Sequence, residues 1–403
     1  MWTLLLLACG PRSGPDTPSP PTGPVMEQSQ GEAADLAAAR AFSASRPLYE
    51  QPLDEGALPD TGSLSAAACG ACHVDHYADW QRSTHARAWT DAQLQAELTK
   101  SGNRWLCLNC HSPLRVQQDL LAIGLVDGDV ERPRLVANPD FDPDLRAEGV
   151  TCAGCHVRQG VIHGPGHPGR SAPHAVKADP AYASGALCLR CHQAEVTYPG
   201  KGFACAFDTG ATWAAGPAAA AGQGCVDCHM QTTTRAVALG GPLRSVAQHG
   251  FPGSGIPKSA DHQPVDFAPG LDLEAVWQGP TVTVRSINAR AGHSLPTGDP
   301  ERWVALRLTF TDAAGAPTGE PWTRRIGQTW RWWPEAERLA DDRLPAGGRL
   351  EDRVPVPEGA VAATLIAESH RLSAETAAYH KLEDIPRMIE THRLHLTPGS
   401  AAP

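Results

Sequence analysis

One arrangement of reactive side chains recurs five times along the chain: two cysteines separated by two residues, with a histidine directly after the second. Positions i, i+3 and i+4 lie on one face of a helical turn, so two thiols can bond the two vinyl groups on one porphyrin edge while the imidazole lies under the iron. C-x-x-C-H is the attachment signature of haem c. The five copies are Cys69-Gly-Ala-Cys72-His73, Cys107-Leu-Asn-Cys110-His111, Cys152-Ala-Gly-Cys155-His156, Cys188-Leu-Arg-Cys191-His192 and Cys225-Val-Asp-Cys228-His229.

Two other interpretations of paired cysteines are weaker. Zinc knuckles also use C-x-x-C pairs, and cysteines of extracytoplasmic proteins form disulfides. Neither requires a histidine after every second cysteine, and a random chain of this composition would contain on the order of one hundredth of a match. The sequence therefore predicts five covalently bound haem c groups, each with its iron, and the five motif histidines as proximal iron ligands.

The sixth ligand of each iron decides the chemistry, because a filled position favours electron transfer and an open position permits reactions of small molecules. Methionine is a poor candidate, since only Met1, Met26, Met230 and Met388 are present and Met230 directly follows a proximal histidine. Ligation by two histidines is the expected state. Twelve of the 17 histidines remain for five positions, so some of them must have other roles.

The composition suits a protein that is organised around cofactors. Aromatic residues are 6% of the 403 residues, while Gly and Pro number 39 and 36, which leaves little material for an ordinary core. Large apolar macrocycles would supply the missing buried surface. The net charge is −10 and no basic run occurs, which argues against nucleic acid as a partner. It weakly favours basic redox proteins or cytochromes as partners.

The N-terminus resembles the end of a bacterial lipoprotein signal peptide over residues 1–9, with Leu6-Leu7-Ala8-Cys9 as its lipobox. Cleavage there would leave a lipidated Cys9 that anchors the protein to a membrane. The apolar run is short and no Lys or Arg precedes it, so an uncleaved leader with a free Cys9 stays an alternative. Residues 10–62 are expected to form a flexible tether with a short helix over 32–42. No apolar stretch approaches the roughly 20 residues of a membrane-spanning helix.

The remaining chain divides into two predicted domains. The motifs begin at residues 69, 107, 152, 188 and 225, which gives a loose repeat within a mainly helical and irregular haem domain over 63–262. So little polypeptide per haem predicts that neighbouring haems lie close together. Residues 263–403 have short strands and Gly/Pro turns, which predict an all-β sandwich of the immunoglobulin-like type without its cysteine pair. The expected strands cover 281–287, 303–311, 325–330, 350–356, 360–368 and 391–396.

The run from Cys69 to Trp89 resembles multihaem cytochromes of the cytochrome c-554 and hydroxylamine-oxidoreductase type, through the motif, Tyr77, Trp80 and Ser83-Thr-His85-Ala. In that family the later histidine is a distal haem ligand, which implies this role for His85. The blocks that contain His163 and His249 are also similar, and the resemblance implies distal ligation by both. His174 and His167 are weaker candidates and His262 is a reserve, whereas His76 has no counterpart and is expected on the surface.

A further block, Gly292-His293-Ser-Leu-Pro-Thr-Gly298, is similar to a turn in β-domains that are attached to such cytochromes. The resemblance implies that His293 extends from the sandwich to a haem, so that the β-domain clamps the haem array. A turn histidine that only caps its own loop is the alternative. We expect structural roles for His370, His380, His392 and His395, for Cys205 as a buried apolar thiol, and for the tryptophans at 322, 330, 332 and 333 in the core and rim.

The sequence thus predicts an electron carrier that passes electrons between periplasmic or outer-membrane redox partners. Haem c is attached outside the bacterial cytoplasm, which fixes the side of the membrane. The alternative is a multihaem oxidoreductase in which one open iron acts on a small nitrogen or sulfur compound, as in relatives of this superfamily. No C-x-x-C-K motif occurs, and no side chain is assigned a catalytic role.

Overall fold

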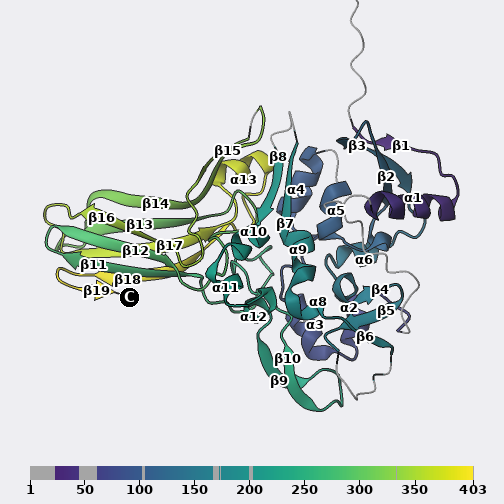
Figure 1. The fold of residues 1–403 in the computed structure, drawn as a ribbon. Helices are drawn as coiled ribbons and strands as arrows, with labels where there is room; N and C mark the ends of the chain where they lie inside the picture. The colour runs from purple at the N-terminus through teal and green to yellow at the C-terminus, as the bar shows by residue number, and fades with distance from the viewer. Residues whose placement is uncertain are drawn as a thin grey trace, which may run out of the picture.

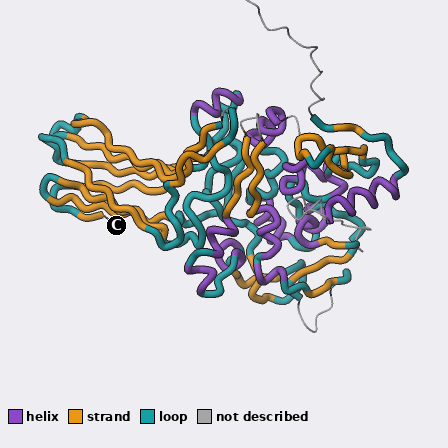
Figure 2. The backbone as a smooth tube through the Cα atoms, turned by 45° about the horizontal axis from the view of Figure 1, so that its top comes forward, coloured by secondary structure: helices purple, strands orange, loops and turns teal. Residues whose placement is uncertain are grey.

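The computed structural model describes residues 23–44, 61–101, 105–166, 172, 174–198, 203–332 and 334–402. An N-terminal region of short helices, hairpins and irregular segments precedes a C-terminal region of antiparallel sheets (Figures 1 and 2). The predicted signal segment with Cys9, His167 and Trp333 lie outside the described residues. Within the described part of the chain, every helix is too short or too polar to cross a membrane.

Short helices carry most of the N-terminal region, and the five motifs lie on or at the ends of five of them. The helices are α1 (Glu32–Ala44), α2 (Ala66–Gly70), α3 (Val74–Gln81), α4 (Ala92–Ser101), α5 (Trp105–His111), η2 (Arg115–Gln117), α6 (Pro143–Ala147), α7 (Cys152–His156), α8 (Ala181–Ser184), α9 (Ala186–His192), α10 (Thr209–Ala214), α11 (Pro217–Ala220) and α12 (Cys225–His229).

Small sheets join these helices. The strands are β1 (Val25–Met26), β2 (Leu120–Val126), β3 (Asp129–Ala137), β4 (Val157–Arg158), β5 (Val161–Gly164), β6 (Val176–Ala178), β7 (Gln193–Tyr198), β8 (Phe203–Asp208), β9 (Thr232–Ala236) and β10 (Leu243–Ala247). They form the sheets β1-β3-β2 and β4-β5-β6 and the hairpins β7-β8 and β9-β10. The expected mainly helical domain is thus more mixed than predicted.

The predicted tether is partly ordered. The expected short helix is present as α1, whose Ala39 is buried against Leu121 and Val136 of the β2-β3 hairpin. In front of it, Val25 and Met26 pair in parallel with Arg134 and Leu135. The chain is therefore attached to the haem region from residue 25, because its backbone groups find partners in β3 instead of water.

The C-terminal region consists of two antiparallel sheets, ordered β16-β12-β11-β19 and β15-β14-β13-β17-β18. One hydrophobic core of residues from both sheets lies between them. A helix, α13, lies at the junction with the N-terminal region (Figure 1). The elements are β11 (Leu271–Gln278), β12 (Thr281–Asn288), β13 (Trp303–Thr311), β14 (Pro317–Arg331), β15 (Glu337–Asp341), β16 (Arg349–Pro355), β17 (Ala362–His370), α13 (Ala374–His380), β18 (Met388–Leu396) and β19 (Ala401–Ala402).

All six expected strands are present, and β13 shows why the alternation of apolar residues in the sequence predicted them. Every second residue of β13 is buried, from Val304 to Phe310, while the residues between them are less buried or exposed. Four elements were not predicted: β11, β15, β19 and α13. Two sheets that share one core agree with a layered β region, but the immunoglobulin type itself is not confirmed.

Side chains alone give the N-terminal region little core. Its hydrophobic clusters are small, and one of the largest contains Leu64, Leu114, Leu145, Ala153 and Val157. The core of the C-terminal sheets is several times larger. The motif helices therefore surround a space that apolar side chains do not fill.

Candidate functional site

A single large cavity runs through the N-terminal region and reaches the junction with the β sheets. Its volume is about 4070 Å³, whereas a pocket for one small molecule usually measures about 300–1,000 Å³. All ten motif cysteines and all five motif histidines line it. The ten cysteines are free thiols, and no group of three or more His, Cys, Asp or Glu within the described ranges could hold a metal ion by itself.

Local capping places the motifs at helix ends. Ser65 caps α2 and Thr151 caps α7, since each side-chain oxygen accepts a hydrogen bond from a backbone N–H of the first turn. Glu148 joins the two helices, because its carboxylate accepts from the Ser65 hydroxyl at 2.5 Å and from the Ala66 N–H at 2.7 Å. The first and third motifs are therefore held side by side.

Backbone carbonyls orient the motif histidines. The Nδ1 atom of His73 lies 2.8 Å from the Val237 carbonyl oxygen, and that of His111 lies 2.9 Å from the carbonyl oxygen of Ala88. His156 and His229 make the same contact with the carbonyls of residues 163 and 252, each at 2.7 Å. Donation from Nδ1 leaves the Nε2 lone pair of these four rings free for a metal, as second-sphere partners of metal-bound histidines do.

Four motif histidines face a second histidine ring across the cavity. The centroid separations are 6.2 Å for His73 and His174, 6.0 Å for His156 and His249, 6.2 Å for His192 and His85, and 6.2 Å for His229 and His293. Two imidazoles that share one metal ion would stand about 6 Å apart, since metal–nitrogen bonds are about 2 Å and each ring nitrogen lies about 1 Å from its centroid. The donor sets therefore fit four irons with two imidazoles each.

Burial favours the neutral form of five of the eight rings. Desolvation inside the cavity lowers the pKa of His85 and of His249 to about 3, and that of His192 to about 4. It also lowers the pKa values of His156 and His293. A neutral imidazole keeps the lone pair that a metal needs.

The segment that carries His85 depends on a glycine. Gly149 has a φ of +65°, and a Cβ atom there would lie 2.8 Å from the His85 carbonyl oxygen. That carbonyl accepts a hydrogen bond from the Val150 N–H at 3.1 Å, while the Trp80 indole donates to the Val150 carbonyl at 2.8 Å. The Glu148-Gly149-Val150 block, which lies just before the third motif in the sequence, thus positions His85.

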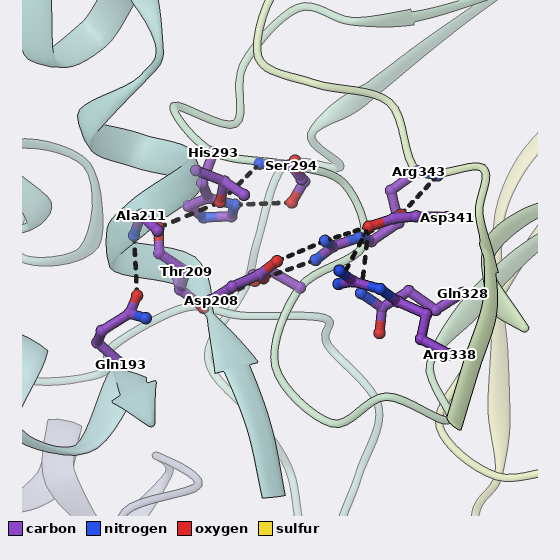
Figure 3. Close-up of polar contacts among 12 residues, drawn as sticks. Gln193, Asp208, Thr209, Ala211, His293, Ser294, Gln328, Arg338, Asp341 and Arg343 are labelled. Atoms are coloured by element: carbon purple, nitrogen blue, oxygen red, sulfur yellow. Dashed lines mark hydrogen bonds and ion pairs between the residues drawn. The ribbon is translucent and has the colours of Figure 1, made fainter. Parts of the chain in front are cut away.

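His293 belongs to a turn of the β region that two sets of contacts fix; Figure 3 shows the second set, around Arg343. The amide of buried Asn288 donates to the carbonyl oxygens of His293 at 2.8 Å and Leu344 at 3.0 Å. Next to Leu344, Arg343 donates to both carboxylate oxygens of Asp208 at 2.7 and 2.6 Å, across the junction of the two regions. Arg343 also pairs with Asp341 on its own side.

The expectations for His163 and His76 differ from the structure, whereas the candidate His174 lies in the cavity. His163 does not line the cavity. It gives its backbone carbonyl to His156, and its ring lies 3.5 Å from Asp179. The weaker candidate, His174, stands opposite His73 instead.

His76 was expected on the surface, yet it lines the cavity, 4.8 Å from His249 and 6.2 Å from His73. Desolvation lowers its pKa to about 4. His73 and His76 do not fit opposite faces of one haem, because three residues advance a helix by only about 4.5 Å, too little to pass round a macrocycle.

His111 stands apart from the other motif histidines. In the part of the chain that the structure describes, no second histidine ring lies opposite it in the way seen for the other four. Desolvation lowers the pKa of His111, and Lys258, Asp91 and Asp299 also interact electrostatically with its ring. Within the described ranges, the donor set at the second motif therefore provides one imidazole.

Contacts between motifs order the attachment points in space. The Cys69 thiol hydrogen-bonds with that of Cys152, and the Cys188 thiol with that of Cys225. Gly185, with a φ of +71°, permits the second contact, since a Cβ atom there would lie 2.9 Å from the Cys225 sulfur. Helix α5 of the second motif packs against α9 of the fourth.

Two arginines that the sequence analysis did not single out fit the propionate groups of haem. Arg244 and Arg302 both line the cavity. Within the described residues, the buried Nη1 atom of Arg244 and the buried Nε atom of Arg302 have no hydrogen-bond partner. A buried guanidinium nitrogen without an acceptor is costly, so these atoms suit an anion inside the cavity.

The other histidines have protein partners. The reserve candidate His262 is not available to a metal, because Nδ1 accepts from the Lys258 N–H at 3.0 Å and Nε2 lies 3.0 Å from the Arg82 carbonyl oxygen. His370 stacks on Trp303 with centroids 4.4 Å apart. In β18, His392 and His395 contact the hydroxyls of Thr391 and Thr364.

The remaining expectations concern the lone cysteine and the tryptophans. Burial raises the pKa of Cys205, as expected for an inert thiol. Trp322 packs against the core of the sheets. Trp330 and Trp332 stack with centroids 5.4 Å apart, and both line the cavity.

Comparisons with known proteins support the predicted cofactor class. Residues 68–124 match the family described as cytochrome c554 and c-prime. The fold is similar to the crystal structure of a penta-heme cytochrome c552 from Thermochromatium tepidum, with a TM-score of 0.59, 19% sequence identity, and coverage of 83% of this chain and 98% of that chain. No curated protein matches. The first two motifs thus lie in a segment of cytochrome c554 type, and the chain has the fold of a five-haem cytochrome.

Proposed function

We propose that this chain, a multihaem c-type cytochrome, transfers electrons through five covalently bound haem c groups, four of which have two histidine ligands. The observation that carries the proposal is the set of four opposed histidine pairs, with ring centroids 6.0 to 6.2 Å apart. An iron held by two imidazoles exchanges single electrons and has no position open to substrate. The protein supplies spacing, ligation and burial.

Each motif histidine would be a proximal ligand and its facing ring the distal ligand. His174 would complete the first haem, His249 the third, His85 the fourth and His293 the fifth. The Nδ1 contacts of His249 and His293 with the carbonyls of Ala247 and Ser294, at 3.1 and 3.0 Å, support this assignment because they leave Nε2 free. The fifth haem would thus be held jointly by both regions of the chain.

The proposed electron route follows the contacts between motifs. The first haem neighbours the third through Cys69 and Cys152, and the fourth neighbours the fifth through Cys188 and Cys225. Cys155 and Cys191 lie within electrostatic range of each other, which supports a link between the third haem and the fourth. Cys72 and Cys228 are exposed, so partner proteins would exchange electrons at the first and fifth haems.

The second haem would be a branch from this route, next to the fourth haem through the packing of α5 on α9. A second candidate function follows from the single imidazole at His111: a multihaem oxidoreductase in which this iron binds a small nitrogen or sulfur compound. An iron with one protein ligand permits such binding. Electrons would then reach the branch from the fourth haem.

The match to a cytochrome c554 segment indicates an extracytoplasmic location. Within that compartment we propose the periplasm or the outer membrane, with a lipid anchor at Cys9. The proposed partners are other redox proteins or cytochromes, and the net charge of −10 favours those with a basic surface.

Electron paramagnetic resonance of the air-oxidised protein tests the proposal, with the haems counted by the pyridine haemochrome assay. We expect five haems, four with low-spin ferric signals and one high-spin. A high-spin signal that shifts with an added small ligand would favour the second function. Two or more high-spin haems would refute the ligand assignment, and fewer than five haems would refute the cofactor count.

A further inference from the structure

Two carboxyl groups in the cavity have no role in holding the haems. Glu97 belongs to α4, and Glu301 belongs to the turn between β12 and β13. Both line the cavity. Among the described residues, each has one buried carboxylate oxygen, Oε2, without a hydrogen-bond partner. An ionised carboxylate is costly in such a place.

The other oxygen of each group contacts the helix at the junction of the two regions. The Thr376 hydroxyl donates to Oε1 of Glu301 at 2.9 Å, and Nε2 of His380 lies 3.4 Å from Oε1 of Glu97. Both partners belong to α13, whose buried Ala377 lies in one hydrophobic cluster with Ala92 and Ala96 of α4. The two carboxyl groups therefore lie in one packed layer between the haem region and the sheets.

Burial favours the protonated form of both groups. Burial raises the pKa of Glu97 to about 7, with Asp299 adding to the shift and Lys100 opposing it. Burial raises the pKa of Glu301 to about 8, with Asp299 and Glu97 adding to the shift and the Thr376 hydrogen bond and Lys100 opposing it.

The other charged groups near the pair are few. Arg325 lies within electrostatic range of Glu301. The Asp299 carboxylate accepts a hydrogen bond from the Gln93 amide at 3.2 Å. Burial lowers the pKa of His380, so this ring is not a cation beside Glu97.

This carboxyl pair lies beside the second haem site. The charge of Glu97 reaches Cys107, the first cysteine of that motif, whose pKa burial and Glu97 together raise to about 12. Asp299 connects the second haem site with the carboxyl pair, since it interacts electrostatically with the His111 ring and with both carboxyl groups. The electrostatic field at this haem and the ionisation of the pair are therefore coupled.

We propose that Glu97 and Glu301 take up a proton when the haem attached to Cys107 and Cys110 is reduced, so that electron uptake at this haem is coupled to proton uptake. One electron from an external one-electron donor reduces the ferric iron to the ferrous state. This removes one positive charge, so a nearby carboxylate binds one proton from solvent at its oxygen, and the charge of the site is unchanged. The inference rests on the proposed function, since it requires that this haem is bound.

The test is a potentiometric titration of the five-haem protein at several pH values from about 5.5 to 9.5, followed by electron paramagnetic resonance. The midpoint potential of the second haem should fall as the pH rises between about 6 and 9. The slope should correspond to the uptake of about one proton per electron, and the potential should not depend on pH outside this range. In the double variant Glu97→Gln, Glu301→Gln, the midpoint potential of the second haem should not change with pH over the whole range. Glu375→Gln, a change in the same cavity, should keep the pH dependence.

Infrared difference spectra of the reduced and oxidised protein give a second readout. Wild type should show a gain of protonated carboxyl absorption on reduction at about pH 8 that the double variant lacks. A level wild-type potential, or a pH dependence that survives in the double variant, would overturn the inference. If the double variant does not fold, each single variant should remove part of the dependence.

Failure of the proposed function is visible in the same samples. A count of fewer than five haems refutes the cofactor assignment before any titration. A spectrum with five low-spin haems refutes the single-ligand state of the second haem. The inference is then decided by whether one of the five potentials loses its pH dependence in the double variant.

Discussion

Replacing Asn288 with alanine should release the turn that carries His293 and convert one haem in five from low spin to high spin. The side chain is fully buried and makes three hydrogen bonds. Its amide donates to the carbonyls of His293 and Leu344, and its oxygen accepts from the Ala291 N–H at 3.2 Å. Asn288 is thus a positioning residue for a proposed iron ligand.

The cost follows from these bonds. Three buried hydrogen bonds contribute about 0.5–1.5 kcal/mol each, but the Leu344 carbonyl keeps a second donor, the Leu295 N–H at 2.8 Å. We therefore expect a loss of about 2–3 kcal/mol, which raises the population of the opened turn by a factor of about 30 to 150.

Asn138 offers a matched control far from this turn. It is 6% exposed, and its amide donates to the carbonyls of Arg115 and Gln118 at 2.9 and 2.7 Å while its oxygen accepts from the Asp140 N–H at 3.3 Å. Asn138→Ala should lose a similar unfolding free energy in chemical denaturation and keep the wild-type spin states. If both variants gave the same resonance spectrum, the reasoning that Asn288 holds an iron ligand in place would be refuted.

Three further outcomes can be checked. His174→Ala should add one high-spin haem to the resonance spectrum while His163→Ala adds none, and the reverse result would restore the sequence-based assignment. Glu301→Gln should be more stable than wild type at pH 9 and equal to it at pH 4 in denaturant titrations, because the raised pKa, about 8, makes the wild type lose stability as the pH rises from about 4.5 to 8. Gly185→Ala should lower haem incorporation in the pyridine haemochrome assay, because alanine strains a backbone with φ +71° and meets the sulfur of Cys225; full incorporation would show that this contact can relax.

The sequence predicted the attachment chemistry because that chemistry is local. Two thiols and an imidazole within five residues suffice for each haem, so the spacing alone predicts five sites. Distal positions are not local, and the same reasoning succeeds only in part. The structure brings His85, His249 and His293 opposite motif histidines, each from a block whose pattern resembles a known family.

The placement of the His163 ring outside the cavity has a physical reason. A histidine seven residues after His156 is a natural candidate for the same neighbourhood, and it is indeed there. However, β5 returns its backbone toward His156, so the His163 carbonyl takes the Nδ1 hydrogen bond and its ring turns toward Asp179. Which face of a short strand points into a cavity depends on tertiary pairing, and here β6 pairs in parallel with β5 just beyond His174.

The sheets show the same division between local and tertiary information. Strand β13 has a clean alternation that predicts its buried face. Strand β11 alternates equally well from Leu271 to Trp277, with every second residue buried, so a signal existed that the sequence analysis missed. The junction could not be predicted, because Arg343 and Asp208 are 135 positions apart and meet only through the packing of both regions.

The contacts between cysteines of different motifs constrain the biosynthesis of this protein. Cys69 and Cys152 lie within hydrogen-bond distance, and so do Cys188 and Cys225. In an oxidising compartment, adjacent thiols are converted to disulfides, and a crosslink between two motifs would block both. A chain that became compact before its thioether bonds formed would therefore be trapped. For the proposed five-haem protein we therefore expect maturation from the extended polypeptide, with each motif modified before its neighbour arrives and compaction last.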